Sequence, residues 1–120
     1  MTITIHGQTP SLKNRKKITC KGNRPRMYTE KSVKDWQKDA LQELMQYTGQ
    51  QDGKVMMDYM FYVKDDAVRD ISNMIQSVED ILVEKGLLID DSWQHVCIGT
   101  ADAQIDRDNP RCEVTIVELE

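Results

Sequence analysis

Residues 54–86 read KVMMDYMFYVKDDAVRDISNMIQSVEDILVEKG, and this stretch decides the fold. The run from Lys54 to Val63 is mostly apolar and rich in β-branched and aromatic residues, which predicts a central strand. After Asp70 in the sequence, apolar residues recur every three or four positions, which predicts an amphipathic helix that ends at Gly86. A buried strand followed directly by such a helix indicates a domain in which a helix packs on a sheet.

The flanking segments supply the remaining elements of the prediction. They are a strand at residues 2–5, a loop at about 8–28, a helix from Ser32 that stops before Gly49, a strand at 94–101 and a final strand at 112–119. The predicted order is therefore β-loop-α-β-α-β-β, which indicates one α+β domain over residues 1–120. We expect a small mixed sheet of about four strands with two helices packed on one face.

Charge is distributed unevenly along the chain. The whole sequence has 16 basic and 20 acidic residues and a net charge of −4, yet residues 12–38 contain ten basic and two acidic residues, a net charge of +8. In this stretch the basic residues alternate with hydrogen-bonding and turn-forming residues, which suits a mobile loop that follows a phosphate backbone. A solvated surface without a ligand is the alternative interpretation.

Acidic residues flank the helix behind Asp70. The short segment from Gly86 to Asp90 can run back along the helix as an extended chain, at about 3.3 Å per residue, so we expect Asp91 to approach Asp70. Two or three carboxylates beside a basic loop predict a Mg²⁺ site, because Mg²⁺ prefers oxygen ligands and a substrate phosphate. The alternative is that Asp70 only caps the helix and that the acidic pair at 90–91 only forms a turn.

The order of several motifs resembles the pattern of the RusA-type Holliday junction resolvases, small endonucleases often encoded by phages. The family pattern has a P-S-x-N-like basic loop, then D-x-D-N-x-x-K, a later D-A-L, a glycine and D-D-x-x-V. The matching segments are PSLKNR at 10–15, NRPRMY at 23–28, DISN at 70–73, EDIL at 79–82, Gly86, and DDSWQHV at 90–96.

This resemblance implies a homodimer that binds four-way, branched DNA and makes paired nicks in DNA recombination or repair, with Mg²⁺ as cofactor or Mn²⁺ in its place. Asp70, Asp91 and Asp90 would be the metal-binding catalytic carboxylates. The DNA-binding residues would be Lys13, Asn14, Arg15, Lys16, Lys17, Arg24, Arg26 and Arg69. Possible supporting residues are Ser72, Asn73, Gln76 and Asp80.

Two positions depart from the family pattern. Ser72 stands where the motif has its second aspartate, and Gln76 stands where it has lysine. Ser72 supplies no negative charge, and Gln76 cannot neutralise charge that develops in the transition state. We therefore expect weaker metal binding or slower cleavage. A protein of the same fold that binds branched DNA without cutting it is the main alternative, and a DNA mimic that uses its acidic body is a weaker one.

Other classes of function find little support in the sequence. No apolar run approaches the roughly 20 residues of a membrane span, and the first residues lack a secretory pattern, so we expect a cytoplasmic protein without a membrane partner. Cys20, Cys97 and Cys112 have no C-x-x-C spacing, which favours reduced thiols over a zinc site. Trp36, Trp93 and Tyr28 could stack on exposed bases, although Trp36 is expected in the core.

Overall fold

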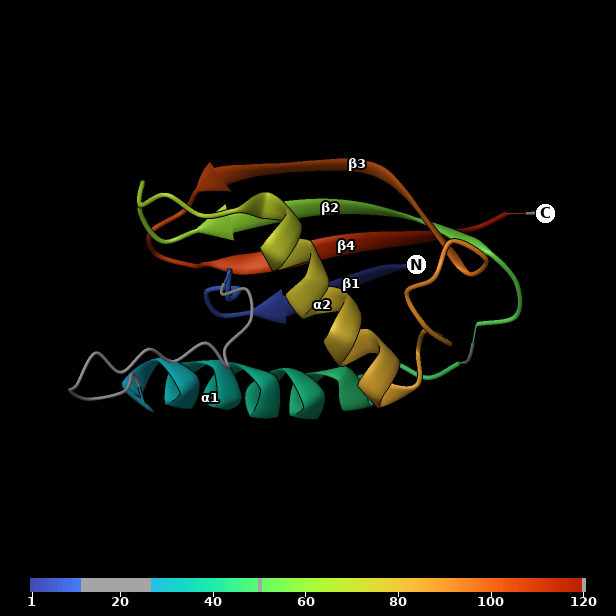
Figure 1. The fold of residues 1–120 in the computed structure, drawn as a ribbon, viewed down its shortest axis with the longest axis horizontal. Coiled ribbons are helices and arrows are strands. Elements are labelled where there is room, and N and C mark those ends of the chain that lie inside the picture. Colours follow the sequence, from blue (N-terminus) through green and yellow to red (C-terminus); the bar gives the residue numbers. More distant parts are fainter. Residues whose placement is uncertain (12–26, 50, 120) are drawn as a thin grey trace.

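The computed structural model describes residues 1–11, 27–49 and 51–119 (Figure 1). Within these residues the order of elements confirms the predicted α+β fold. The elements are β1 (Thr2–His6), α1 (Met27–Glu43), the short 3₁₀ helix η1 (Leu44–Gln46), β2 (Val55–Val63), α2 (Ile71–Lys85), β3 (Val96–Ile105) and β4 (Arg111–Glu118).

The four strands form one mixed sheet in the order β1-β4-β2-β3. As predicted, β2 is central: it pairs antiparallel with β4 and parallel with β3, while β1 pairs antiparallel with β4. Alternate residues of β2 from Val55 to Val63 are buried, and the residues between them are half-buried on the other face. Figure 1 shows α2 crossing one face of the sheet and α1 running beside β1.

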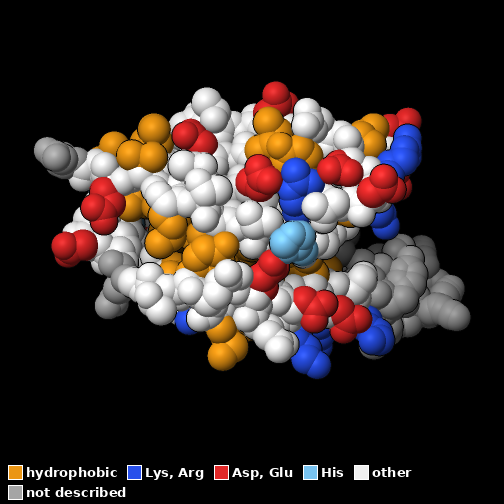
Figure 2. Space-filling model, turned by 180° about the vertical axis from the view of Figure 1, so that it is seen from behind, with side chains coloured by type: hydrophobic (Ala, Val, Ile, Leu, Met, Phe, Trp, Pro, Cys, Tyr) orange, Lys and Arg blue, Asp and Glu red, His pale blue; other side chains and the backbone are white. Residues whose placement is uncertain are grey.

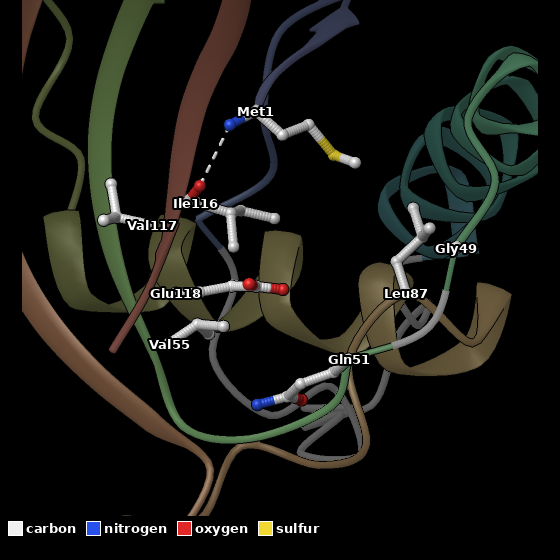
Figure 3. A pocket seen from close by; sticks show the side chains of 8 residues that line it. All are labelled: Met1, Gly49, Gln51, Val55, Leu87, Ile116, Val117 and Glu118. Atoms are coloured by element: carbon white, nitrogen blue, oxygen red, sulfur yellow. Dashed lines mark hydrogen bonds between the residues drawn. The ribbon is translucent and has the colours of Figure 1, made fainter. Parts of the chain in front are cut away.

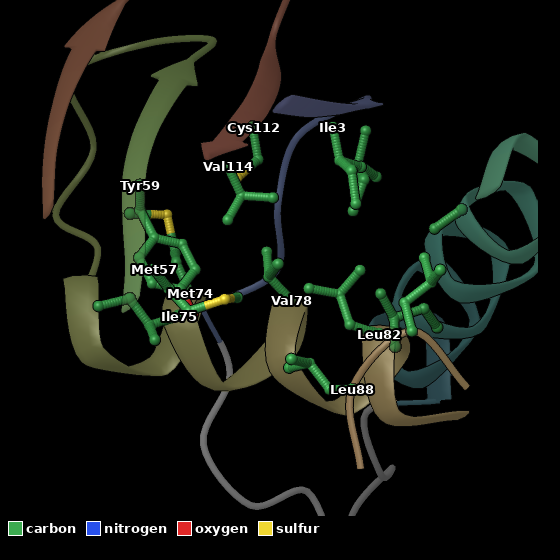
Figure 4. Packing of buried hydrophobic residues seen from close by; sticks show 14 of the residues in the cluster. Ile3, Met57, Tyr59, Met74, Ile75, Val78, Leu82, Leu88, Cys112 and Val114 are labelled. Atoms are coloured by element: carbon green, nitrogen blue, oxygen red, sulfur yellow. The ribbon is translucent and has the colours of Figure 1, made fainter. Parts of the chain in front are cut away.

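Helix α2 occupies the predicted position because both of its ends carry strong signals. Asp70 is the N-cap in an extended conformation, and Gly86 ends the helix with a φ of 90°, which glycine adopts without strain. Between them, Met74, Val78 and Leu82 point into the core against β2, β4 and β1 (Figure 4). The crossover from β2 through α2 to β3 therefore fixes where the polar face of the helix lies.

Two predicted elements differ from the structure by several residues. Helix α1 begins at Met27, so Ser32 lies inside the helix and does not start it. The five residues before Ser32 include no glycine or proline, so nothing in the sequence prevents the helix from extending toward Pro25. Strand β3 spans 96–105 and not 94–101, because pairing with β2 continues where the apolar pattern of β3 has already ended.

The face of the sheet turned away from the helices is only partly polar. Met56, Met60 and Tyr62 of β2 are half-buried there, and the Arg111 guanidinium lies 3.8 Å from the centroid of the Tyr62 ring. Arg111 also forms ion pairs with carboxylates of β4 and of the turn before it. Figure 2 shows this side of the molecule, where hydrophobic groups alternate with acidic side chains.

Candidate functional site

Asp91 meets α2 at the middle of the helix. The side-chain amide nitrogen of Gln76, Nε2, donates to Asp80 Oδ1 at 2.8 Å and to Asp91 Oδ2 at 3.0 Å. Gln76 and Asp80 are one turn apart on the exposed face of α2, so the amide links the helix to the segment that returns after it. Two carboxylate oxygens thus converge on one nitrogen atom at the surface.

The returning segment is held in place by its apolar residues. Leu87 and Leu88 are buried, and their backbone N–H groups both donate to the carbonyl oxygen of Leu82. This anchoring turns the chain back beneath α2 and brings Asp91 to Gln76. Gln76 lies six residues beyond Asp70, which is about 9 Å of helical rise, so the return covers only part of the helix.

Asp70 forms a helix cap, as the alternative interpretation supposed. Its Oδ1 accepts from the backbone N–H of Ser72 at 3.0 Å and from the Ser72 hydroxyl at 2.8 Å. Ser72 therefore directs its hydroxyl at the carboxylate of Asp70. It stands where the RusA-type motif has its second aspartate. An exposed capping carboxylate can still bind an additional ligand through its other lone pairs.

Asp90 closes the turn that precedes β3. Its Oδ1 accepts from the Ser92 hydroxyl at 2.7 Å, from the Ser92 backbone N–H at 3.0 Å, and pairs with His95 Nδ1 at 2.8 Å. These hydrogen bonds from Ser92, followed by that of His95, lower the pKa of Asp90 to about 2. Asp90 thus shapes the turn beside Asp91, and its predicted role as a metal ligand stays a prediction.

A buried carboxylate lies behind the surface pair and was not singled out from the sequence. Glu79 is 6% exposed and accepts a 2.6 Å hydrogen bond from the Tyr59 hydroxyl of β2. Burial raises the pKa of Glu79, and the hydrogen bond from Tyr59 offsets only part of this increase. The charges of Asp91 and Asp80 raise the pKa further. Burial likewise raises the pKa of Tyr59. The sequence signal is a glutamate four residues after Ile75, on the apolar face of the helix.

The N-terminal segment reaches the same face of α2. The Ser77 hydroxyl donates to the carbonyl oxygen of Pro10 at 2.9 Å and to that of Asn73 at 3.2 Å. Residues 12–26, which follow directly, include the predicted DNA-binding residues Lys13, Asn14, Arg15, Lys16, Lys17, Arg24 and Arg26, and these lie outside the described residues. Pro10, which just precedes the basic stretch in the sequence, therefore lies beside the polar face of α2.

Arg69, the remaining predicted DNA-binding residue, is engaged within its own loop. One guanidinium nitrogen pairs with Asp65 Oδ1 at 2.8 Å, another donates to the carbonyl oxygens of Asp65 and Ala67, and the side chain is 12% exposed. The backbone N–H of Ala67 and the Arg69 guanidinium lower the pKa of Asp65. Arg69 thus orders the loop that leads to Asp70, and its DNA contact stays a prediction.

The donor set for a metal ion is therefore partial. Among residues 1–11, 27–49 and 51–119, no group of three or more His, Cys, Asp or Glu side chains is arranged to hold a metal ion. Mg²⁺ in enzymes commonly uses one or two carboxylates, several waters and the phosphate of a substrate. Asp80 and Asp91 supply two such carboxylates, each with a second oxygen besides the one that Gln76 contacts, so they fit such an ion.

A model of the family Endodeoxyribonuclease RusA matches residues 8–117. The chain belongs to the RusA family. The matched region contains the basic stretch, both helices and the turn at Asp90–Asp91, so it covers every residue of the site described above. A comparison with curated proteins gives no match.

RusA proteins are endodeoxyribonucleases that act on branched DNA junctions. Relative to the RusA motif, the neutral side chains of Ser72 and Gln76 both contact carboxylates: Ser72 contacts Asp70, and Gln76 contacts Asp80 and Asp91. The departures from the motif are thus inside the site, where they change its charge.

A hollow lies near the chain ends (Figure 3). Its volume is about 470 Å³, and its lining includes Met1, Val55, Leu87 and Glu118. The terminal amine of Met1 donates to the carbonyl oxygen of Ile116 at 3.1 Å beside it.

None of the described helices is long and apolar enough to cross a membrane.

Proposed function

We propose that this RusA-family protein is a metal-dependent endonuclease that nicks four-way DNA junctions and thereby resolves them. The observation that supports the proposal best is the convergence of Asp80 and Asp91 on Gln76 in a chain of this family. An acidic site repels DNA unless cations intervene, and the basic residues among 13–26 would supply the attraction.

The proposed cofactor is Mg²⁺, for which Mn²⁺ can substitute. Asp91 and Asp80 would hold one such ion at the middle of α2, Asp70 would bind a second at the start of the helix, because ten helical residues separate Asp70 from Asp80, and Asp90 would fix the turn that presents Asp91. When bound, such an ion supplies an activated water and charge stabilisation for phosphodiester hydrolysis. Gln76 then orients the two surface carboxylates, and the basic residues 13–26 position the DNA backbone.

A second copy of the chain is part of the proposal. A four-way junction has near two-fold symmetry, so paired nicks require two equivalent sites. Strand β3 is at the edge of the sheet, and its Ile98 and Ile105 are 50% and 46% exposed. Sedimentation at several protein concentrations tests the homodimer, and a monomer at every concentration that supports paired nicking would contradict it.

The test of cleavage compares a labelled four-way junction with a linear duplex of the same sequence, in Mg²⁺ or Mn²⁺. We expect paired nicks in the junction only, and a loss of at least about a hundred-fold in rate in Asp91→Asn and Asp70→Asn. Asp39→Asn is the matched control, because Asp39 is an exposed carboxylate on α1. Undiminished nicking in both site variants would refute the assignment.

A protein that binds junctions without cutting them is the second candidate, and the neutral side chains at 72 and 76 favour it. The same assay separates the two functions. Tight binding of the junction without nicks in Mn²⁺, which tolerates imperfect sites, would identify a binding protein.

A further inference from the structure

Trp93 is a large aromatic side chain that the fold leaves exposed. It is 74% exposed, whereas Trp36, the other tryptophan, is 7% exposed and belongs to the core. An exposed indole contributes little to the stability of the fold, because it buries little surface. Trp93 also follows Asp91 by only two residues, so it belongs to the same turn as the candidate catalytic carboxylate.

The turn that carries Trp93 is well fixed by hydrogen bonds. Asp90 Oδ1 accepts from the backbone N–H of Ser92 and pairs with His95 Nδ1. The backbone N–H groups of His95 and Val96 donate to the carbonyl oxygen of Ser92 at 3.0 and 2.9 Å. Gln51 ties the turn to the preceding segment by donating to the carbonyl oxygen of His95 at 2.7 Å. Trp93 thus projects from an ordered backbone, and binding through it requires little further ordering.

A positive charge lies against the indole. The Lys54 ammonium is 5.5 Å from the ring centroid of Trp93, within the range of a cation–π contact. The backbone of Lys54 is itself fixed, because its carbonyl oxygen accepts from the N–H of Leu119 at 2.9 Å. An exposed aromatic face beside an ammonium group is the combination that binds an unpaired base and its phosphate.

We propose that Trp93 stacks on an unpaired base of the DNA substrate and that Lys54 contacts the adjacent phosphate. This inference rests on the proposed function, since it places the stacked base beside the phosphate that the Asp91 site would cleave. Stacking tolerates any base, because every base has a π-face. Trp93 would therefore favour DNA with exposed bases, such as the centre of an opened junction, over continuous duplex.

Tryptophan emission provides a direct test. Wild-type protein without divalent cations is titrated with a four-way junction, a thymidine single strand and a linear duplex. Because Trp36 is buried, a change in emission reports Trp93. We expect quenching by the junction and the single strand but not by the duplex, and no quenching in Trp93→Phe.

Affinity measurements by anisotropy use Trp93→Leu, which keeps an apolar side chain without a π-face, and Trp93→Phe, which keeps a ring. We expect affinity for the junction and the single strand to fall about ten-fold in Trp93→Leu and much less in Trp93→Phe, with duplex affinity unchanged. Lys54→Gln should reduce the salt dependence of single-strand binding by a slope of about 0.7.

The outcomes separate this inference from the proposed function. The inference would be overturned, and the proposed function left intact, by the following result. The wild type nicks the junction, DNA does not quench its emission, and Trp93→Leu and Trp93→Phe bind DNA as tightly as the wild type. Quenching without any nicking would overturn cleavage and support base stacking. A Trp93→Leu effect on sedimentation but not on DNA binding would overturn the inference and assign Trp93 to a protein contact.

Discussion

At position 72 the site has a hydroxyl where the RusA motif has a carboxylate, and this residue offers a specific test. The Ser72 hydroxyl donates to Asp70 Oδ1 near the N-terminus of α2, a place where negative charge interacts favourably with the helix dipole. We predict that Ser72→Asp folds normally and lowers the Mg²⁺ concentration for half-maximal nicking roughly ten-fold. Thr48→Asp, on an exposed segment, is the control for added charge.

Combining that change with Gln76→Lys should raise the maximal nicking rate, because a cation at position 76 can neutralise charge that develops in the transition state. Nicking rates at saturating Mg²⁺ measure this. Equal metal requirements in the wild type and Ser72→Asp, and equal maximal rates in Ser72→Asp and the double variant, would show that neither position tunes the site.

Glu79 predicts a pH dependence of stability. Its pKa is raised in the folded state, chiefly by burial, so above about pH 4.5 the folded protein binds more protons at this residue than the unfolded chain. The contribution of Glu79 to stability is complete below that pH and is lost as pH rises through the raised pKa. We predict that melting temperature falls less from pH 5 to pH 7.5 in Glu79→Gln than in the wild type.

Glu84→Gln is the matched control for Glu79→Gln, since Glu84 is exposed on the same helix. In this variant the melting temperature should follow the wild-type pH profile. If Glu79→Gln also kept that profile, the raised pKa would not couple to folding.

At the scale of elements, the irregular pairing of β2 with β3 depends on Gly99. The register shifts between Met57 and Tyr59, where Asp58 Oδ1 accepts from the backbone N–H and the hydroxyl of Thr100 at 2.8 and 3.2 Å. A Cβ atom on Gly99 would lie 2.2 Å from that same oxygen. Any side chain at position 99 would therefore collide with Asp58 while Asp58 keeps its hydrogen bonds to Thr100 of the edge strand β3.

We predict that Gly99→Ala lowers the free energy of unfolding by about 1–3 kcal/mol, because Asp58 must give up both hydrogen bonds to move away. Urea unfolding measures the change. Gly53→Ala is the control, since no atom lies within 4 Å of its added Cβ. In the Asp58→Ala background the cost of Gly99→Ala should be smaller, and an undiminished cost there would point to a different cause.

At the scale of the whole molecule, the segregation of charge predicts how DNA affinity responds to salt. Each phosphate contact by a basic residue contributes about 0.9 to the slope of log affinity against log salt. We predict that Lys16→Gln with Lys17→Gln reduces this slope by about 2. Lys34→Gln with Lys38→Gln, on the exposed face of α1, should leave it nearly unchanged. Equal reductions in both pairs would show that α1 contacts the DNA as much as the loop does.

The sequence predicted elements well where local signals agree. Asp70 and Gly86 delimit α2 because capping and left-handed backbone are local properties, and β2 was recognised because a buried strand is continuously apolar. The ends of α1 and β3 were missed for the opposite reason. Strand β3 is exposed along most of its length, so its limits follow from pairing with β2 and leave no pattern of burial in its own residues.

The sequence by itself determined the α+β class, the order of elements, the basic stretch and the acidic residues on either side of α2, because these depend on local periodicity, capping and charge. Only the tertiary structure decided which side chains meet. Asp91 contacts Gln76 at the middle of the helix, and Glu79 pairs with Tyr59 of β2. The depth to which Leu87 and Leu88 pack sets how far the chain returns along α2, and packing depth depends on residues distant in sequence.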